Sequence, residues 1–463
     1  MMLAHSGKHH RPEIATINLL TPPDHQVLGL VEIRNYDDRR EEWIRKVLRH
    51  SRVLFLTQIG PEVPRPLASF REFDEVRRIS QQSSYGILIL WDTGKWLSFN
   101  TELLSLAVHD GHDASRRSHY GGKIAAVREV PILQIRDGWV LVKVNAVALN
   151  PADWKHIDYG AADTGCRIGF DYSGIVVGIR SNVTKFKKGD RIAGAVHGGE
   201  RTDHALGAFA DYIIAKAAIQ IHIPDGLSDE EAATLGVGMS TVSLGLYKSL
   251  GLPLPDAPAR APFPVLIHAA STAAGVLGIQ YAKASGLTVI ATASPHNFNY
   301  LRSLGADAVF DCKSPTCASE IKEYTKNKLR FVWDCMGTGA AICAAAMSDA
   351  EPGIYGTINS INPEDERLLN EMNPNVGGPR FVLGYDAFGE TYTFMGKTVP
   401  AKPEPLDYAA MFYELSQRLF GEGVIKPIKP TINKGGSGLE AALNRLDELR
   451  GSKVSGTKLV YTL

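Results

Sequence analysis

The sequence predicts an α/β protein in which a small β-rich domain precedes a doubly wound parallel sheet. Short strands punctuated by glycine begin after Gly121, a proline-rich segment interrupts the chain at 252–264, and strands alternate with helices beyond it. The chain has 463 residues, of which 44% are hydrophobic, so two folded domains and an additional segment are expected.

The predicted organisation has four segments. Residues 1–114 form an N-terminal extension of unknown fold in which no catalytic motif occurs. Its apolar runs at 53–56 and 87–91 suit strands of a small α/β unit, and they suit a poorly ordered extension or a misplaced chain start equally well. The other predicted segments are the β-rich catalytic domain at 115–255, the nucleotide-binding domain at 256–400, and a return to the catalytic domain at 401–463.

Two strands define the β-rich domain. The stretch W-V-L-V-K-V-N at 139–145 has the period of two expected of a half-buried strand. A second strand at 172–179 contains Gly174 and Gly178. Short strands interrupted by glycine are typical of a small β-rich domain.

The region after residue 264 has the rhythm of a parallel sheet. The prolines of 252–264 fix φ and remove N–H donors, so this segment is the predicted domain junction. A strand at 265–268, a helix at 272–285 followed by Gly286, and a strand at 288–292 form a βαβ unit. Further helices are predicted at 298–304, 340–347, 408–419 and 438–449, and further strands at 308–310, 331–334, 355–358 and 458–462.

Composition excludes several classes of partner. Lys plus Arg and Asp plus Glu both number 50, so no net charge would hold the chain on nucleic acid or an acidic membrane. The first residues lack a signal-peptide core and no run approaches about 18 apolar residues, which predicts a soluble, cytosolic protein.

No cysteines form a C-x-x-C pair, which argues against a disulfide framework or a cysteine-bound zinc lobe. The cysteines are Cys166, Cys312, Cys317, Cys335 and Cys343.

The turn after the strand at 265–268 predicts a dinucleotide site. It reads H-A-A-S-T-A-A-G at 268–275, which is not a strict G-x-G-x-x-G. Small residues let the backbone approach a pyrophosphate, Ser271 and Thr272 can donate from their hydroxyls, and the helix N-terminus supplies free N–H groups. The alternative is a packing turn with an ordinary Ser/Thr N-cap.

The end of the next strand favours NADPH over NADH. An NAD site places Asp or Glu there to bind the ribose 2′-hydroxyl, but this chain reads A-S-P-H-N at 293–297. No carboxylate is present to repel a 2′-phosphate, and Ser294, His296 and Asn297 offer donors. The alternative is a plain Ser-Pro turn.

Several motifs carry a family resemblance. They are N-P-A-D-W-K at 150–155, G-F-D-Y-S-G at 169–174, G-D-R at 189–191, G-A-F-A-D-Y at 207–212 and the segment 232–241. From about residue 116 onward the chain resembles the medium-chain dehydrogenase/reductase superfamily. It is also similar in closer detail to the trans-acting enoyl reductases of fungal highly reducing polyketide synthases, as in lovastatin assembly. These details are S-T-A at 271–273, S-P-H-N at 294–297, Y-T-K-N at 324–327, D-C at 334–335 and V-S-G-T-K-L at 454–459.

The resemblance implies a GroES-like catalytic domain, a Rossmann domain, NADPH as cofactor and an acyl pocket. The implied NADPH contacts are Ala152, Asp153, Trp154, Lys155, Ser271, Thr272, Ala273, Ala274, Ser294, Pro295, His296, Asn297, Ile361, Asn362, Gly456 and Thr457. The implied acyl pocket lies beside 241–250 and 385–390. Its candidate residues are Thr241, Val242, Leu244, Leu246, Tyr247, Tyr385, Phe388, Gly389 and Glu390.

The implied reaction is reduction of an activated C=C bond. Hydride from nicotinamide adds to the β-carbon of an α,β-unsaturated thioester and leaves an enolate. Lys155 is the preferred catalytic cation because its ammonium can anchor the cofactor ribose or lie near the enolate, and Thr241 can donate a hydrogen bond beside it. The alternatives are a solvated Lys155 and a Thr241 bonded to its own backbone. Asp153 and Asp171 are expected to brace loops by accepting backbone N–H bonds.

Two departures from the family pattern concern the cofactor. The frequent Gly-Gly before Ser-Thr is Ala269–Ala270 here, and Cys312, kept as a cofactor-binding candidate, stands where a cofactor-contacting Tyr is frequent. A positive φ at Ala270 would cost roughly 1 kcal/mol, which is tolerable. Zinc-dependent relatives bind metal through Cys and Gly-His-Glu, but Asn150 and Phe170 stand in the equivalent stretches, so no metal is expected.

The resemblance also implies a partner, an acyl thioester on the carrier domain of a polyketide synthase, with the reductase acting as a monomer. One alternative is a quinone or small-enone reductase with the same fold and cofactor. The other is a noncatalytic binding protein that retains the fold and uses the N-terminal extension to interact.

Overall fold

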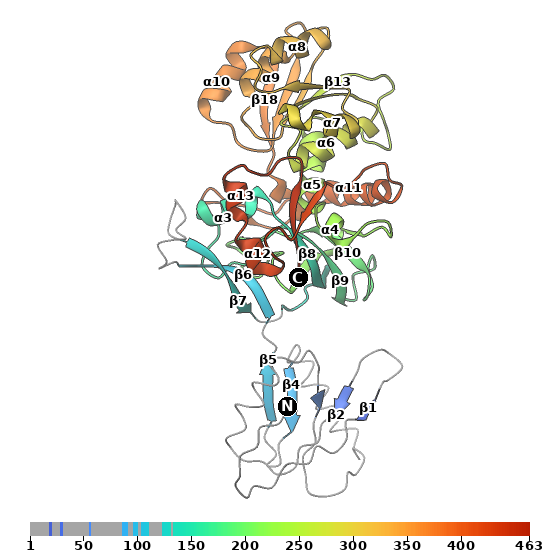
Figure 1. Ribbon diagram of the computed structural model, residues 1–463, viewed down its shortest axis with the longest axis vertical. Helices are drawn as coiled ribbons and strands as arrows, with labels where there is room; N and C mark the ends of the chain where they lie inside the picture. Colours follow the sequence, from blue (N-terminus) through green and yellow to red (C-terminus); the bar gives the residue numbers. More distant parts are fainter. Residues whose placement is uncertain are drawn as a thin grey trace, which may run out of the picture. The chain divides into compact units, whose positions relative to one another are not determined.

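The computed structural model describes residues 123–130 and 133–463, together with six short strands nearer the N-terminus (Figure 1). The chain separates into two compact units, one of 1–102 with 130–134 and one of 103–129 with 135–463. The six strands are β1 (Asn18–Leu20), β2 (Leu28–Leu30), β3 (Phe55–Leu56), β4 (Gly86–Leu90), β5 (Trp96–Asn100) and β6 (Leu103–Asp110). The apolar run at 53–56 therefore contains β3, the run at 87–91 overlaps β4, and the residues of 1–114 between the six strands lie outside the described residues.

A mixed sheet forms the β-rich part of the second unit. Its strands run in the order β12-β10-β9-β8-β22-β21, and β11 pairs with β8. All neighbours are antiparallel except β21 and β22. The strands are β8 (Trp139–Ala148), β9 (Asp171–Ile179), β10 (Arg191–Ala195), β11 (Tyr212–Lys216), β12 (Gln220–His222), β21 (Pro430–Ile432) and β22 (Lys458–Thr462). The last strand of the chain thus lies beside β8, and β7 (Lys123–Val130) pairs with β6.

Gly174 explains how β8 and β9 pair so closely. Its backbone faces Lys143, and a Cβ at this position would overlap the Lys143 carbonyl oxygen. The register of the two strands also shifts at Leu141/Val142 and again at Val144/Ala146. The glycines that interrupt the predicted strand therefore mark close contact within one continuous strand, not its ends.

A parallel sheet of six strands forms the other half of the second unit, and its doubly wound parallel arrangement agrees with the prediction. Its order is β15-β14-β13-β16-β17-β18, and every neighbouring pair is parallel. The strands are β13 (Pro264–His268), β14 (Thr288–Ala293), β15 (Ala308–Asp311), β16 (Phe331–Asp334), β17 (Gly353–Thr357) and β18 (Val376–Phe381). This is the doubly wound order, in which the direction of winding reverses between β13 and β16.

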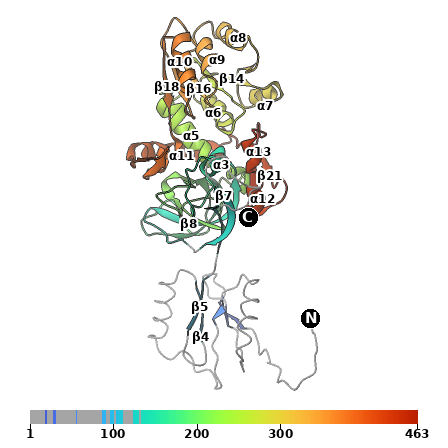
Figure 2. The same ribbon diagram turned by 90° about the vertical axis from the view of Figure 1, so that its left-hand side faces the viewer.

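Helices cover both faces of this sheet (Figures 1 and 2). On one face, Val265 and Ile267 pack in a core with α6 (Ala273–Ala284) and α11 (Pro403–Gly421). On the other face, Leu266 packs with α8 (Cys317–Tyr324), α9 (Ala340–Ala346) and α10 (Pro363–Met372). Alternate residues of β13 therefore serve opposite cores, as expected of a strand buried on both sides.

Shorter helices complete the second unit. They are α3 (Pro151–Asp158), α4 (Asp229–Ala232), α5 (Gly236–Thr241), α7 (Phe298–Ser303), α12 (Gly438–Leu443) and α13 (Leu446–Arg450). The 3₁₀ helices are η3 (Ala217–Ile219), η5 (Pro295–Asn297) and η6 (Gly384–Phe388), and η4 (Val242–Ser249) is a π-helix that continues α5. A hairpin of β19 (Tyr392–Phe394) and β20 (Lys397–Val399) follows η6.

Two predicted helices differ from the structure. The helix expected at 438–449 is divided into α12 and α13, and α11 begins five residues before the predicted start at 408. In addition, α8, α10 and β18 were not predicted from the sequence. The α10 start carried a usable signal, because Asn362 caps it and Pro363 begins it. β18 contains Gly377, Gly378 and Pro379, which oppose a strand in local propensity and hid it.

Among the residues that the structure describes, no helix combines the length and apolar character needed to cross a bilayer.

Replacing Gly174 tests the close pairing of β8 and β9. Gly174→Ala is expected to lower the free energy of unfolding by about 3 kcal/mol, because the new methyl group forces one strand to move. Urea unfolding followed by circular dichroism measures this change. Gly226→Ala is the matched control: no atom lies within 4 Å of its Cβ position, so its effect should stay within about 0.5 kcal/mol. Equal effects of the two substitutions would contradict the proposed crowding.

Candidate active site and cofactor turn

The candidate site lies at the carboxyl ends of the parallel strands. β13 and β16 are neighbours whose connections leave in opposite directions, and ligands bind in the crevice that such a reversal creates. The loop after β13 carries Ser271, the loop after β14 carries Ser294, and the loop after β17 carries Asn359. Three of the loops that matter to the prediction therefore leave the same edge of the sheet.

The turn after β13 has the shape of an anion-binding turn. Thr272 is the N-cap of α6, and its Oγ1 accepts the Gly275 N–H at 3.1 Å. A Cβ on Gly275 would lie 2.6 Å from the Ala270 Cα, so the helix can approach the strand only with glycine there. The free N–H groups and the positive end of α6 then face the crevice with small side chains around them.

Ala269 carries the backbone strain of this turn. Its φ is 55°, in the left-handed region. Ala270, the position considered from the sequence for a positive φ, does not have one, so the strained residue is one position earlier than expected. The Ala269 N–H donates to Thr292 Oγ1 at 3.1 Å, and that hydroxyl lies 2.8 Å from His268 Nδ1. Burial lowers the pKa of His268, so the neutral ring can accept the Thr292 hydrogen and hold the strained turn in place.

The C-terminal segment lies against the cofactor turn. The Gly456 N–H donates to the Ser271 carbonyl at 3.0 Å, and Ser455 Oγ lies 3.5 Å from Ser271 Oγ. Asn297, which is buried, donates from Nδ2 to Ser455 Oγ at 2.9 Å. The structure thus brings together the predicted cofactor segments after β13, after β14 and before β22.

Other predicted cofactor residues have partners of their own. Thr457 donates from its hydroxyl to the Lys429 carbonyl at 2.8 Å. Asn362 caps α10 by accepting the Asp365 N–H at 2.8 Å, and Ile361 packs against the core under that helix. Cys312 follows β15, and burial raises the pKa of its thiol, which favours the protonated form. Ser294, Pro295 and His296 are partly or fully exposed beside them.

Lys155 points from α3 to the loop after β17. Its Nζ donates to Asn359 Oδ1 at 3.3 Å across 204 positions of sequence. Asn359 Nδ2 donates to the Met336 carbonyl at 3.0 Å, so the amide is oriented with its oxygen toward the lysine. Burial lowers the pKa of Lys155. Sequence reasoning missed Asn359, although a polar residue directly after a predicted parallel strand was a signal for it.

Thr241 has the alternative arrangement considered from the sequence. Its hydroxyl donates to the Val237 carbonyl at 2.6 Å, one helical turn earlier. In the π-helix that follows, the predicted pocket residues Val242, Leu244, Leu246 and Tyr247 are all buried in the main core. The Tyr247 hydroxyl pairs with Ser285 Oγ at 2.7 Å. These four side chains therefore contribute to packing, and their contact with an acyl chain stays a prediction.

A buried polar network supports the start of α3. Asp171 accepts the Val237 N–H at 2.6 Å and an Asn150 amide hydrogen at 3.0 Å, and it pairs with Lys458. Asp153 accepts the Asn150 N–H at 2.5 Å. The expectation that Asp153 and Asp171 brace the backbone is therefore confirmed. Desolvation by burial raises the pKa of Asp153 well above its ordinary value, which the sequence did not reveal.

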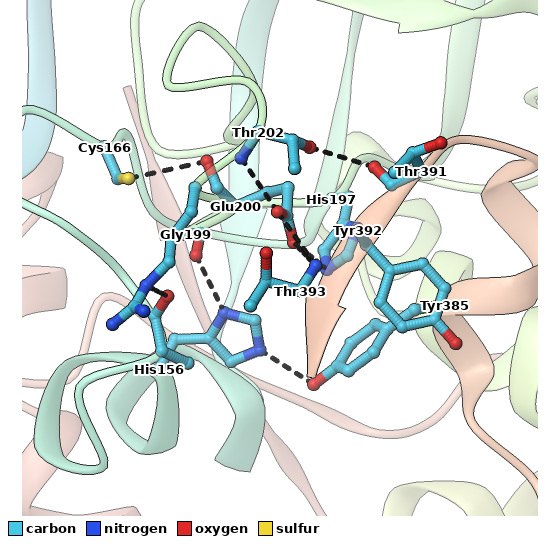
Figure 3. A network of polar contacts seen from close by, with 12 residues as sticks. His156, Cys166, His197, Gly199, Glu200, Thr202, Tyr385, Thr391, Tyr392 and Thr393 are labelled. Carbon is cyan, nitrogen blue, oxygen red and sulfur yellow. Dashed lines mark hydrogen bonds and ion pairs between the residues drawn. The ribbon is translucent and has the colours of Figure 1, made fainter. Parts of the chain in front are cut away.

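The remaining pocket candidates belong to a crossing segment, residues 384–399, that follows the parallel sheet and contacts the β-rich part. In it, Tyr385 stacks on His197 with ring centroids 4.5 Å apart (Figure 3). Phe388 stacks on the same imidazole at 5.2 Å. Glu390, directly after Gly389, forms an ion pair with Lys216 of β11. Aromatic rings therefore fill the space beside Phe170.

A metal site would need convergent ligands. Within residues 123–130 and 133–463, no group of three or more His, Cys, Asp or Glu side chains converges to hold an ion. Asn150 donates to Asp171, and Phe170 stacks with Tyr385 at 5.9 Å between centroids. Neither Asn150 nor Phe170 carries the thiolate or imidazole that binds zinc in zinc-dependent dehydrogenases.

Ala269→Gly tests the strain in the cofactor turn. Glycine adopts φ of 55° freely, so the free energy of unfolding is expected to rise by about 1 kcal/mol or slightly less. Thermal unfolding measures the change. Ala270→Gly, one residue later and outside the left-handed region, should instead lower stability by about 0.5–1 kcal/mol. The same sign for both variants would contradict the assignment of strain to Ala269.

The lowered pKa of buried His156 predicts that the protein loses stability in acid. Burial lowers its pKa to about 4, while an unfolded histidine binds a proton near pH 6.5. The unfolded state therefore binds more protons between these values, and stability that is complete above pH 6.5 falls by about 3 kcal/mol as the pH drops to 4. The free energy of unfolding, measured by urea unfolding at several pH values in this range, should depend less on pH for His156→Gln than for the unchanged chain. His204→Gln, at an exposed histidine, should keep the original slope.

Two families of domain match the halves of the second unit. Residues 136–225 match the Alcohol dehydrogenase GroES-like domain, and residues 273–355 match the Zinc-binding dehydrogenase family. Among solved structures, the CurK enoyl reductase has 21% identity and a TM-score of 0.58, covering 78% of this chain and 99% of that one. A putative zinc-dependent alcohol dehydrogenase from Rhizobium etli has 24% identity and a TM-score of 0.62, with coverage of 78% and 98%. These structures support the fold.

Curated relatives are more similar in sequence. Trans-enoyl reductase ACTTS2 of Alternaria alternata is 40% identical over 73% of this chain and 95% of its own length. Trans-enoyl reductase resD of Aspergillus sclerotiorum is also 40% identical, over 73% and 97%. Trans-enoyl reductase TOXD of Cochliobolus carbonum is 43% identical over 58% and 88%. The chain therefore belongs to the trans-enoyl reductases, within the medium-chain dehydrogenase/reductase superfamily.

Proposed function

We propose that this chain reduces the C=C bond of an α,β-unsaturated polyketide thioester, presented by the carrier domain of a highly reducing synthase, with NADPH as the reductant and the reductase acting as a monomer. The observation that carries the proposal is the Lys155 ammonium, held by Asn359 at the edge where the cofactor turn lies. Family membership supplies the reaction class, because an enoyl reductase is an oxidoreductase of C=C bonds with a nicotinamide cofactor.

The residues after β13 and β14 suit a dinucleotide phosphate. The turn at 269–272 combines small side chains, a helix N-terminus and the close approach of helix to strand that Gly275 allows. After β14, no carboxylate occurs in 293–297 to bind a 2′-hydroxyl or repel a 2′-phosphate. His296 is exposed there and can donate to a phosphate, so NADPH is the favoured form.

NADPH, when bound, supplies the hydride. The thioester enolate that results needs a nearby positive charge and then a proton at its α-carbon. Lys155 can serve both needs: its ammonium has donors beyond the one used by Asn359, and burial lowers its pKa, which makes the ammonium a better acid. A preorganised charge in a partly dry site is more effective than the same charge in water.

The other two candidate donors use their hydrogens elsewhere. Thr241 donates to the Val237 carbonyl, and Tyr385 donates to His156. To donate to an enolate, each hydroxyl would first have to break its present hydrogen bond, which is 2.6 Å long for Thr241 and 2.8 Å for Tyr385. Lys155 is therefore assigned the catalytic role, and Thr241 and Tyr385 are assigned to the walls of the site.

A reductase assay tests this assignment. Purified protein is mixed with NADPH and an enoyl thioester on a carrier protein, and loss of nicotinamide absorbance is followed. Lys155→Met is expected to lower kcat by roughly 100-fold or more, because the enolate loses its countercharge and proton source. Lys328→Met, at an exposed lysine far along the sequence, should leave kcat unchanged.

The other candidate activities give different outcomes. Oxidation of NADPH by quinones alone would favour a quinone reductase, and failure to bind NADPH in a fluorescence titration would favour a noncatalytic binding protein. NADH used as well as NADPH would contradict the cofactor preference inferred from 293–297.

A further inference from the structure

His156 and Tyr385 form a buried hydrogen bond between distant parts of the chain. Tyr385 Oη lies 2.8 Å from His156 Nε2, and the residues are 229 positions apart (Figure 3). His156 follows Lys155 on α3, and Tyr385 lies in η6 of the crossing segment. The bond therefore connects the helix that carries the catalytic lysine with the segment predicted to line the acyl pocket.

The second bond of the imidazole fixes the direction of the first. His156 Nδ1 lies 3.2 Å from the Gly199 carbonyl oxygen, which can only accept. Nδ1 therefore carries the hydrogen, and Nε2 of the neutral ring is left as an acceptor for the Tyr385 hydroxyl. The ring is held at both nitrogens and cannot turn without losing both bonds.

The Tyr385 ring stands at the centre of an aromatic group. It packs against His156, His197, Phe170, Tyr392 and Phe394 at centroid distances of 4.5–6.4 Å. At the start of η6, a Cβ added at Gly384 would lie 3.9 Å from Thr241 Oγ1. The tyrosine therefore belongs to a wall that extends from α3 to the start of the π-helix.

Other contacts hold the crossing segment independently of this bond. The Thr202 hydroxyl donates to the Thr391 carbonyl at 2.9 Å, and the Thr393 N–H donates to the Glu200 carboxylate at 3.1 Å. Lys216 donates to the Phe388 carbonyl at 2.8 Å. Loss of the Tyr385 hydroxyl alone should therefore leave the segment folded in place.

We propose that the hydrogen bond from Tyr385 to His156 positions the acyl-pocket wall relative to Lys155 and so determines how well long enoyl chains are aligned for reduction. The inference rests on the proposed function of the site. His156 and Tyr385 are positioning residues, because neither has to touch the reacting carbons. A wall that is free to move by a fraction of an ångström misplaces the C=C bond, and alignment errors of that size cost large factors in rate.

Tyr385→Phe is the direct test, with Tyr281→Phe as its matched control. Each substitution removes one hydroxyl that bonds a residue more than 100 positions away, but Tyr281 of α6 donates to Ser416 of α11, at 2.7 Å, outside both α3 and the crossing segment. Tyr385→Phe is expected to lower kcat for a long enoyl thioester roughly tenfold, with a smaller loss for crotonyl thioester and an unchanged Kd for NADPH. Tyr281→Phe should change neither the rates nor their ratio.

A double-mutant cycle separates positioning from general damage. His156→Gln and Tyr385→Phe are made singly and together. For each variant, kcat is measured at a temperature the same number of degrees below its own melting temperature. If the bond acts as proposed, the double variant is no slower than the slower single variant, because both remove the same interaction. Multiplicative losses, or an unchanged ratio of long-chain to crotonyl rates, would overturn the inference.

The proposed function fails in a different way. If the unchanged chain does not reduce enoyl thioesters at all, the reaction class is wrong and the positioning role has no reaction to serve. If the unchanged chain is active and Tyr385→Phe behaves like Tyr281→Phe, the reductase assignment stands and only the positioning role is lost.

Discussion

The buried ion pair of Lys458 and Asp171 is the constraint on which the site depends. Both side chains are at most 3% exposed, and the pair joins the last strand of the chain to β9. Asp171 also binds the N-cap residue of α3 and the first turn of α5 through Asn150 and the Val237 N–H. Removing one charge from such a pair typically costs about 3–5 kcal/mol, because the other is left buried and alone.

This pair connects, through neighbouring residues, the helix that carries the proposed catalytic lysine with the proposed cofactor turn. Lys458 opens β22, and just before it Gly456 binds the Ser271 carbonyl in the cofactor turn. At the other end of the network, Asn150 is the N-cap residue of α3, and Lys155 on this helix donates to Asn359. The β-rich part and the parallel sheet are thus held together at the edge where the reaction is proposed to occur.

Aromatic packing surrounds Phe170, at the position where the sequence lacks the histidine expected of zinc-dependent relatives. Phe170 contacts His156 and Tyr385, and these rings connect α3 with the crossing segment. Nearby, Lys458 supplies the positive charge beside Asp171. Conjugate reduction develops negative charge on an enolate, and Lys155 is the cation proposed to stabilise it.

The sequence by itself determined the α/β class, the alternation of strands and helices after 264 and the turn at 268–275, because these follow from local signals: period-two strands, the βαβ rhythm, and small residues before a helix start. It also showed that no carboxylate occurs at 293–297, and it made Lys155 a candidate for the catalytic role. Tertiary structure alone decided that Ala269 rather than Ala270 has a positive φ and that the Thr241 hydroxyl donates to the Val237 carbonyl. It also decided the partners of three side chains: Asn359 accepts from Lys155, His156 bonds Tyr385, and Lys458 pairs with Asp171. Each of these facts depends on contacts between residues far apart in the chain, and no local pattern encodes which distant partner a side chain will meet.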